Sequence, residues 1–379
     1  MDLDLLDNAL ADAGEPAFRA RQVWEWAAKG VSGYQQMTNL PVELRVRLAR
    51  DVPFSSLDLR EQRTASDGTV KALFTTHDGR PIESVLMRYR DRRRSICVSS
   101  QSGCPLTCTF CATGGMKFAR NLTASEILDQ ALHFRRIEPI DHCVFMGMGE
   151  PMLNLEGVLA ACERLPAVGV SNRRTAISTV GWIPGIERLA ECDMPLRLAL
   201  SLHAADEALR SELMPVNDRY PIADAIDACR AFYERKRRRV FVEYVMLAGV
   251  NDRYEQALSL AKLLSPRRPD EPPRMFKVNL IPYNPTHPTL VHSASGADED
   301  KGERQTAHLA SGARENIGVR QTAHPASGAE ETDRFQGSSR ESIAAFKAAL
   351  ESRGIEATVR LTRGRDIDAA CGQLAARAA

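Results

Sequence analysis

The chain contains the stretch Cys104-Pro-Leu-Thr-Cys108-Thr-Phe-Cys111, in which three thiols lie at spacings of four and three residues. The whole chain has 379 residues and 9 cysteines, an odd number. A disulfide scaffold is normally a short chain dense in cysteines, so tight clustering in a chain of this length indicates metal or redox chemistry. Two further cysteines matter below: Cys97, just before the stretch, and Cys371, near the end of the sequence.

The spacing of the three thiols favours one kind of metal centre. Structural zinc usually takes paired Cys-x-x-Cys knuckles that supply four ligands, and this triplet stands without a second knuckle. Three thiolates on a short loop suit a 4Fe-4S cluster whose fourth iron is open to a ligand. The alternative is three buried or incidental cysteines, which the spacing, Phe110 and the Gly114-Gly115 pair disfavour.

Composition narrows the class of protein. The apolar content of 44% is enough for a sizeable core, and the length predicts two or three domains. A net charge of +1 says little about partners. The first residues, MDLDLLDNALADAG, carry acid where a signal peptide carries base, and no apolar run has the length of a membrane span. We expect a cytoplasmic protein with reduced thiols and no membrane partner.

The chain before the triplet divides into two segments. Residues 1–55 show apolar residues at helical spacing and are predicted to form a small accessory helical domain, whose basic residues are either solvated or face a phosphate backbone. Residues 56–95 alternate like strands at 70–76 and 82–88, with a turn at Asp78-Gly79. The second strand carries Glu83, and a lone strand carboxylate usually lies on the surface. Residues 88–94 hold five arginines, which suit a phosphate-binding strip or a solvated hairpin tip.

Residues 96–290 alternate short apolar strands with helices. Strands are expected near 142–146, 175–179, 196–203, 240–247 and 277–282, and a helix at 124–134 with Thr123 as its N-cap. About six such units predict an α/β fold, a partial (β/α)6 TIM-type barrel with helices outside a parallel sheet. In such folds the site gathers at the carboxyl ends of the strands.

Polar motifs occur at these expected strand ends. Met146-Gly-Met-Gly149-Glu150-Pro151 places a carboxylate beside glycines, where it can pair with an ammonium group, although such a motif alone is more often a turn. Later strand ends carry a further set of polar side chains and their neighbours. By itself, a histidine such as His203 is more often a half-buried residue with its hydrogen bonds satisfied inside the protein than a residue that binds a ligand. The set consists of Ser178, Ser201, Leu202, His203 and Asn284.

Two segments complete the chain. Residues 291–335 repeat a His-x-Ala-Ser-Gly-Ala pattern every sixteen residues and lack the large apolar residues that would bury a core, so we predict a disordered insertion. Residues 336–379 are predicted to form an amphipathic helix at 339–352, a strand at 355–361 and a loop that carries Cys371.

The residues around the triplet resemble a known family. The string ICVSSQSGCPLTCTFCATGGMKFARNLTASEI, residues 96–127, is similar to the RlmN/Cfr group of radical SAM (S-adenosylmethionine) RNA methyltransferases, and to the RlmN branch in particular. The resemblance extends to Thr362-Arg-Gly-Arg-Asp-Ile-Asp-Ala-Ala-Cys371-Gly-Gln-Leu, and only the insertion departs from it. It implies a radical SAM core with a small N-terminal helical domain that contacts RNA, at residues 1–55, and a C-terminal cysteine-bearing extension.

The resemblance also implies an activity and roles for residues. The reaction would be methylation of carbon 2 of an adenine in 23S rRNA, with tRNA open as a second substrate and an electron donor as partner. Cys371 would carry the methyl group, Cys97 would form a disulfide with it to release the product, and Glu83 would accept a proton. The triplet would hold the 4Fe-4S cluster. The SAM contacts would be Gly149, Glu150, Ser178, Ser201, Leu202, His203 and Asn284.

Two alternatives stay open at this point. A Cfr-like enzyme would act on carbon 8 of the same adenine, although the residues that follow Cys111 lean towards the RlmN branch. A non-catalytic iron–sulfur RNA-binding protein would need neither Cys97 nor Cys371, so the presence of both argues against it. The remaining cysteines match no such position and read as structural: Cys143, Cys162, Cys192 and Cys229.

Overall fold

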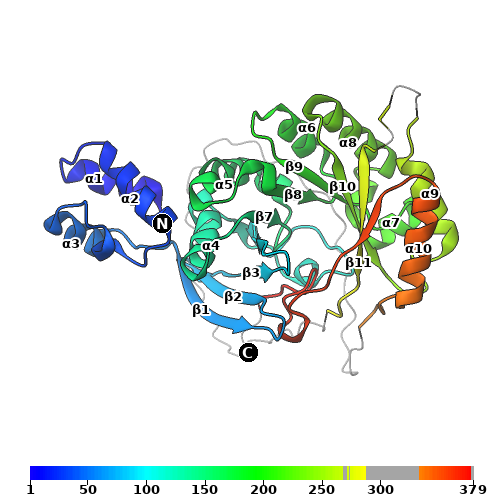
Figure 1. Ribbon diagram of the computed structural model, residues 1–379, viewed down its shortest axis with the longest axis horizontal. Helices are drawn as coiled ribbons and strands as arrows, with labels where there is room; N and C mark the ends of the chain where they lie inside the picture. The colour runs from blue at the N-terminus through cyan, green and yellow to red at the C-terminus, as the bar shows by residue number, and fades with distance from the viewer. Residues whose placement is uncertain (268–270, 273, 287–332, 377–379) are drawn as a thin grey trace, which may run out of the picture.

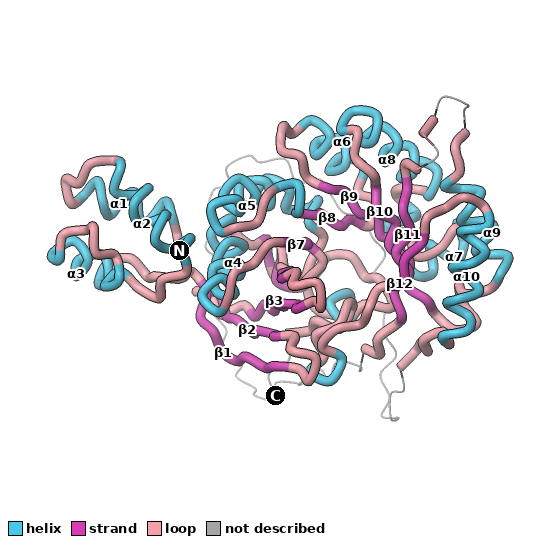
Figure 2. The backbone as a smooth tube through the Cα atoms, in the orientation of Figure 1, coloured by secondary structure: helices cyan, strands magenta, loops and turns pink. Residues whose placement is uncertain are grey.

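A single ten-stranded sheet runs through the computed structural model, which describes residues 1–267, 271–272, 274–286 and 333–376 (Figure 1). Seven of its strands are parallel and curve into an open barrel, as the tube view shows (Figure 2). The predicted α/β partial barrel is therefore confirmed. In sheet order the parallel strands are β4 (Arg94–Cys97), β7 (His142–Phe145), β8 (Thr175–Thr179), β9 (Arg197–Ser201), β10 (Val240–Met246), β11 (Phe276–Pro282) and β12 (Ala357–Val359).

Helices cover the outside of the barrel, as strand–helix repetition requires (Figure 1). The first of them, α4, begins with a capping box in which Thr123 accepts from the Glu126 N–H and Glu126 accepts from the Thr123 N–H. The predicted N-cap is thus confirmed. The barrel helices are α4 (Ala124–Ile137), α5 (Leu155–Val168), α6 (Ile183–Glu191), α7 (Glu207–Leu213), α8 (Ile222–Lys236), α9 (Tyr254–Leu264) and α10 (Arg340–Ser352).

Three antiparallel strands extend the barrel sheet at its β4 edge: β1 (Leu57–Thr64), β2 (Val70–Thr76) and β3 (Pro81–Arg88). The sequence predicts β2 and β3, but not β1 or the short β4. Only Leu57 is buried in β1, since β1 is an edge strand with most of its side chains in solvent. The alternation of apolar and polar residues that marks a strand is therefore missing there. Since β3 pairs directly with β4, Glu83 lies in the same sheet as the barrel.

The N-terminal helices α1 (Leu3–Asp12), α2 (Phe18–Lys29) and α3 (Val42–Asp51) have an apolar core of their own (Figure 1). On another face of α2, Trp24 and Ala28 are buried in the main core. Close approach fixes this docking, since a Cβ on Gly30 would lie 2.9 Å from the Arg135 carbonyl oxygen of α4. The helical segment is therefore packed against the barrel at one side.

Most of the predicted insertion, residues 291–332, lies outside the described residues. Its last residues are described, and Phe335 is buried with its ring 6.2 Å from that of Tyr283. From α10 the chain enters β12 beside β11 and then runs across the open end of the barrel (Figure 1). Among the described helices, none is long and apolar enough to span a membrane.

Candidate active site

The loop that carries the cysteine triplet is closed at its base by β5 (Gln101–Ser102) and β6 (Arg120–Asn121), which pair antiparallel. Gly103 has a φ of 73°, and a Cβ there would lie 2.3 Å from the Lys117 carbonyl oxygen, so only glycine fits this closure. Within the loop, Cys111 N–H donates to the Cys108 carbonyl over 3.2 Å. The sheet and this turn hold the three thiols on one compact loop.

The three thiols fit a cluster better than a single ion. All three cysteines are free, and burial is the main cause that raises their pKa values, with repulsion between Cys104 and Cys108 and between Cys108 and Cys111 as a further cause. A bound cationic centre would compensate such buried thiolates. Among the described residues, the three sulfurs do not form a group whose ligand atoms lie within 4.8 Å of one another, as one ion would require.

A cavity that we call the inner cavity opens beside this loop at the carboxyl ends of the parallel strands. It brings together most of the predicted cofactor contacts, one cluster cysteine and Cys371. Its lining is Phe110, Cys111, Phe145, Met146, Gly147, Gly149, Glu150, Pro151, Ser178, Thr179, Val180, Ser201, His203, Glu243, Val245, Ile281, Tyr283, Arg360, Cys371 and Gly372.

Glu150 is a buried carboxylate without a counter-ion among the described residues. Its two oxygens accept backbone N–H groups from Met152 at 3.1 Å and from Val180 at 3.0 Å. Burial nevertheless raises its pKa to about 7, because the backbone donors offset only part of the desolvation. A ligand ammonium group would restore the charged form, as the predicted role requires.

The turn before Glu150 leaves no room for a side chain. Gly149 has a φ of 97°, and a Cβ would lie 2.5 Å from the Gln101 side chain. Gln101 in turn accepts the Glu150 N–H over 2.8 Å. The glycine is thus required by the close approach of this turn to β5, which places Glu150 next to the triplet loop.

His203 is buried in a single tautomer. Its Nδ1 accepts the Val245 N–H over 3.0 Å, and burial lowers its pKa to about 3, so the ring is neutral with its proton on Nε2. Its φ of 60° is strained for a residue with a side chain. The ring contacts Phe110 of the triplet loop edge-on at 4.7 Å. His203 therefore lines the inner cavity with its Nδ1 satisfied, while its Nε2–H has no hydrogen-bond partner among the described residues.

The remaining predicted cofactor contacts divide into three cases. Ser178 and Ser201 both line the inner cavity, with their hydroxyls 3.2 Å apart. Leu202 is fully buried and does not line the inner cavity. Asn284 donates to the Cys371 carbonyl over 3.3 Å, and its buried Oδ1 has no hydrogen-bond partner among the described residues. That orphaned acceptor fits a ligand that supplies a donor.

A second cavity, the thiol cavity, adjoins the inner cavity and contains both Cys97 and Cys371. Met146, Ile281, Arg360 and Cys371 line both cavities and so form the wall between them. Burial raises the pKa of Cys97 to about 12, while Cys371 is exposed. Both cysteines are free thiols, so the disulfide that the resemblance implies is not formed in this structure.

The loop that carries Cys371 is held against the triplet loop. Ala112 N–H donates to the Gly372 carbonyl over 2.8 Å, and the Thr113 hydroxyl donates to the Leu374 carbonyl over 2.5 Å. Backbone-directed bonds of this kind position the segment whatever its side chains. Residues that lie 261 positions apart in the sequence, such as Thr113 and Leu374, are thus brought together in one site.

Glu83 lines neither of these two cavities, and it is not on the surface as a lone strand carboxylate usually is. It is 1% exposed, and its Oε2 accepts the N–H groups of Ala375 at 3.0 Å and Ala376 at 3.1 Å. Its Oε1 lies 3.1 Å from the ammonium of Lys71. The carboxylate is therefore located beneath the segment that follows Cys371, and it holds that segment down.

Arg360 and Glu243 also line the inner cavity, although no sequence motif pointed to them. Arg360 directly follows β12, and its Nη1 lies 3.3 Å from Glu243 Oε2, while Glu243 Oε1 accepts from the Asn279 amide over 2.8 Å. The attraction of Glu243 is the main cause that raises the pKa of Arg360. Arg360 could have been found from the sequence, because a strand is predicted at 355–361 and functional residues gather at the carboxyl ends of such strands.

The arginine run at 88–94 is only partly free for phosphate. Arg88 and Arg94 both pair with Glu138 of the helix α4 C-cap, and Arg93 stacks over Tyr89 at 4.0 Å. Arg90 and Arg92 are exposed. Three of the five arginines thus have partners within the protein, and only Arg90 and Arg92 fit a solvated hairpin tip or a phosphate contact.

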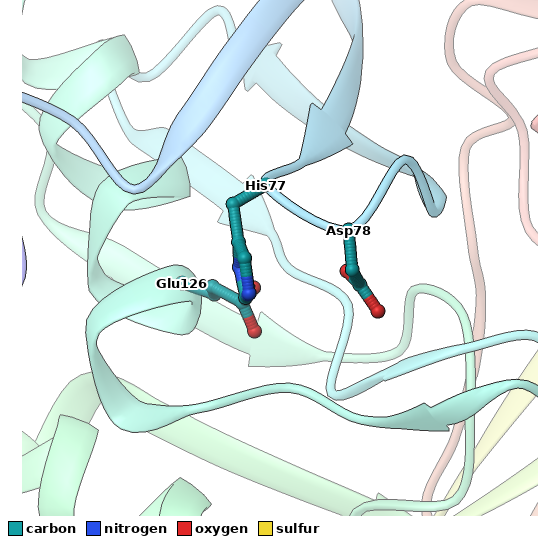
Figure 3. Close-up of side chains that lie close together, drawn as sticks. All are labelled: His77, Asp78 and Glu126. Atoms are coloured by element: carbon teal, nitrogen blue, oxygen red, sulfur yellow. The ribbon is translucent and has the colours of Figure 1, made fainter.

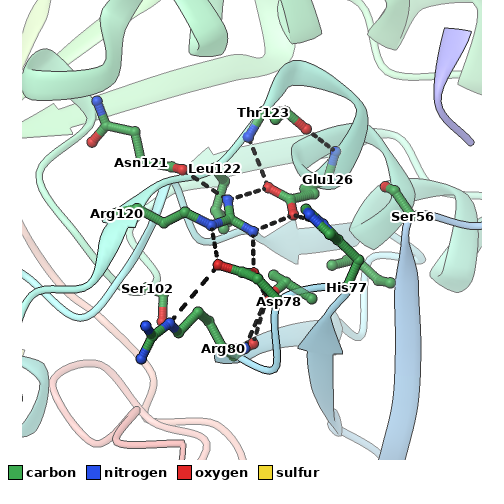
Figure 4. A network of polar contacts seen from close by, with 12 residues as sticks. Ser56, His77, Asp78, Arg80, Ser102, Arg120, Asn121, Leu122, Thr123 and Glu126 are labelled. Carbon is green, nitrogen blue, oxygen red and sulfur yellow. Dashed lines mark hydrogen bonds and ion pairs between the residues drawn. The ribbon is translucent and has the colours of Figure 1, made fainter. Parts of the chain in front are cut away.

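His77, Asp78 and Glu126 lie close enough together to suggest a cation site (Figure 3). Arg120 already occupies that place, because its guanidinium donates to both oxygens of Asp78 at 2.7 and 2.9 Å and to both of Glu126 at 2.7 and 2.8 Å (Figure 4). Paired in this way, the carboxylates have no need of a metal. The network ties the β2–β3 turn to the start of α4 and to the base of the triplet loop.

Known proteins are similar to this chain over most of its length. The Radical SAM superfamily model matches residues 98–261, and the model of the ribosomal RNA large subunit methyltransferase N-terminal domain matches residues 1–52. A probable dual-specificity RNA methyltransferase RlmN from Chloroflexus aurantiacus is 41% identical over 99% of this chain and 92% of the relative. This chain belongs to the RlmN family of radical SAM RNA methyltransferases.

Other members of the family are similar over comparable lengths. The probable RlmN enzyme of Thermus thermophilus is 39% identical over 98% of this chain and 92% of its own length. A crystal structure of a radical SAM methyltransferase from Sphaerobacter thermophilus superimposes with a TM-score of 0.81, at 39% identity, covering 100% of this chain and 98% of that one. The cofactors of the superfamily are a 4Fe-4S cluster and SAM, and the triplet loop and the inner cavity fit them.

Proposed function

We propose that this chain methylates carbon 2 of an adenine in 23S rRNA, and an adenine in tRNA as a second substrate, through a methyl group carried by Cys371. The observation that supports this most directly is the thiol cavity, which joins Cys97 and Cys371 although they lie far apart in the sequence. The relatives named above are described as dual-specificity RNA methyltransferases, which motivates the second substrate.

The chain's residues have distinct roles in this proposal. The exposed thiol of Cys371 is the nucleophile that accepts the methyl group, and it lines the inner cavity, where SAM would bind. Cys97 then bonds to the Cys371 sulfur, while the sulfur–carbon bond breaks with its electron pair passing to the product carbon, which takes up a proton. When bound, the cluster and SAM would supply the one-electron chemistry and the methyl group that methylation of adenine carbon 2 needs.

Further assignments belong to the same proposal. Cys104, Cys108 and Cys111 hold the cluster. Glu150 pairs with the SAM amino group, with the remaining predicted contacts around it: Gly149, Ser178, Ser201, Leu202, His203 and Asn284. An external electron donor feeds the cluster, and the enzyme works in the cytoplasm. Glu83 accepts the proton lost by adenine, which requires that residues 375–376 move off its carboxylate. We also propose that the chain is divided into five segments, which are residues 1–55, 56–95, 96–290, 291–335 and 336–379.

The test is anaerobic reconstitution with SAM and an rRNA fragment, followed by mass spectrometry of the digested RNA. We expect 2-methyladenosine from the unaltered protein and none from Cys371→Ala. Product at carbon 8 would favour the Cfr-like alternative. Full activity of Cys371→Ala would exclude the methyl-carrier role. A Cys162→Ala variant controls for thiol loss as such, because Cys162 is buried in the core away from both cavities.

A further inference from the structure

The thiol cavity is the space in which the adenine of the proposed function would meet Cys371, and its polar groups are few. Its lining is largely apolar, with two guanidinium groups and no carboxylate among the described residues that form it. Arg363 lies 3.6 Å from Asp67 and stacks over Tyr89 at 5.3 Å. Of the two guanidinium groups, Arg360 is the one whose charge interacts with both thiols, Cys97 and Cys371.

Arg360 is held firmly but retains unused donors. The backbone N–H of Arg360 donates to the Leu280 carbonyl over 2.8 Å, continuing the pairing of β12 with β11. Its Nη1 contacts Glu243 at 3.3 Å and the Met146 sulfur at 3.2 Å. Among the described residues, Nε and Nη2 have no hydrogen-bond partner, and the side chain is 26% exposed. Free donors on a fixed guanidinium in a cavity wall are available to a ligand.

An adenine base offers the complementary acceptors. Carbon 2 lies between ring nitrogens N1 and N3, each of which is a hydrogen-bond acceptor. A donor on either nitrogen withdraws electron density from carbon 2 and stabilises negative charge that develops on the ring when a carbon-centred group attacks there. A guanidinium suits this task because it donates hydrogen bonds without giving up its proton.

From this arrangement, and resting on the proposed function, we propose that Arg360 is a catalytic residue that donates a hydrogen bond to N1 or N3 of the substrate adenine. The contact places carbon 2 next to Cys371 and makes it more electrophilic. Glu243 is a positioning residue that fixes the guanidinium and compensates its charge in the barrel. Base recognition of this kind adds no covalent step to the reaction.

The experiment compares Arg360→Lys with the unaltered holoenzyme on rRNA fragments whose target adenine is natural, 1-deaza or 3-deaza. Lysine keeps the charge but loses the planar donor fork. We expect methylation of the natural fragment to fall about 100-fold, while mass spectrometry still finds the methyl group on Cys371. With one of the two deaza fragments, the difference between the two proteins should shrink to a few-fold, because the contact is already absent. Arg353→Lys, on the exposed end of α10, is the matched control.

Three results would overturn the role of Arg360. The first is a rate for Arg360→Lys within about threefold of the unaltered enzyme, far less than loss of a transition-state donor costs. The second is a loss of methyl-Cys371 that accounts for the whole defect. The third is a full difference between the two proteins on both deaza fragments, which would show that neither nitrogen is contacted. If the unaltered enzyme itself makes no methyladenosine, the proposed function fails instead, so the two failures are distinguishable.

Discussion

At the scale of single residues, the site depends on polar groups that burial has deprived of water. Glu150 and His203 are both 5% exposed or less, yet the pKa of the acid is raised and that of the base is lowered. Both shifts favour the neutral forms, as desolvation dictates. The protein thus keeps an acid poised to ionise when a cation arrives and an imidazole poised to donate.

The substitution Glu150→Gln tests whether burial keeps the Glu150 carboxyl group neutral until a cation binds. The folded pKa of about 7 exceeds the ordinary value of 4.5, so the native state binds more protons between these values and its stability falls as pH rises through them. Without SAM, the unaltered protein should lose about 2 to 3 kcal/mol more than the variant between about pH 5 and pH 8. SAM affinity of the variant should fall by about 10- to 100-fold. Thermal unfolding and calorimetric titration measure both. Equal pH dependence of the two proteins would contradict the assignment.

At the scale of elements, the carboxyl ends of neighbouring strands supply the site. Cys97 ends β4, Ser201 ends β9 and Arg360 follows β12. The last of these strands comes from the C-terminal segment and completes the parallel row next to β11. The loop after it is held from below by β2 and β3, since Lys71 Nζ lies 3.1 Å from Glu83 Oε1 and 3.3 Å from the Asp368 carbonyl oxygen.

Lys71→Met should therefore loosen the Cys371 loop. It removes the ammonium and leaves Glu83 as a buried, unpaired charge, which weakens the packing of residues 368–376. We expect Cys371 to be alkylated by iodoacetamide about tenfold faster, which corresponds to about 1.4 kcal/mol. Lys347→Met is the control, because its pair with Glu351 is an exposed helical one. Unchanged alkylation would show that the hydrogen bonds to residues 112–113 hold the loop without help.

At the scale of the whole molecule, folding brings Cys97 and Cys371 into one cavity across most of the sequence. The barrel is open, and the C-terminal segment crosses its open end to reach the triplet loop (Figure 1). In the proposed function, release of the product needs both thiols, so a change at Cys97 should stop the reaction after the new carbon–carbon bond has formed.

Cys97→Ser is expected to trap the product. A serine hydroxyl is a poor nucleophile towards sulfur, so the adenine stays bonded to Cys371 through the methylene carbon. Denaturing gels of the reaction with labelled rRNA should show a protein–RNA species, and Cys371→Ala in the same background should abolish it. Normal turnover of Cys97→Ser would contradict the resolving role.

By itself, the sequence determined the chemistry and the strand–helix order. The triplet, the glycine-rich turn before Glu150 and the Cys371 loop are local motifs, which can be recognised from consecutive residues. The strand–helix order can be recognised as well, because the spacing of apolar residues follows local backbone geometry. Tertiary structure alone decided the rest. The burial of Glu83, the wall that Arg360 forms between two cavities and the pairing of Arg120 with Asp78 and Glu126 join residues distant in sequence. Desolvation and charge pairing depend on these contacts in space, which no spacing along the chain encodes.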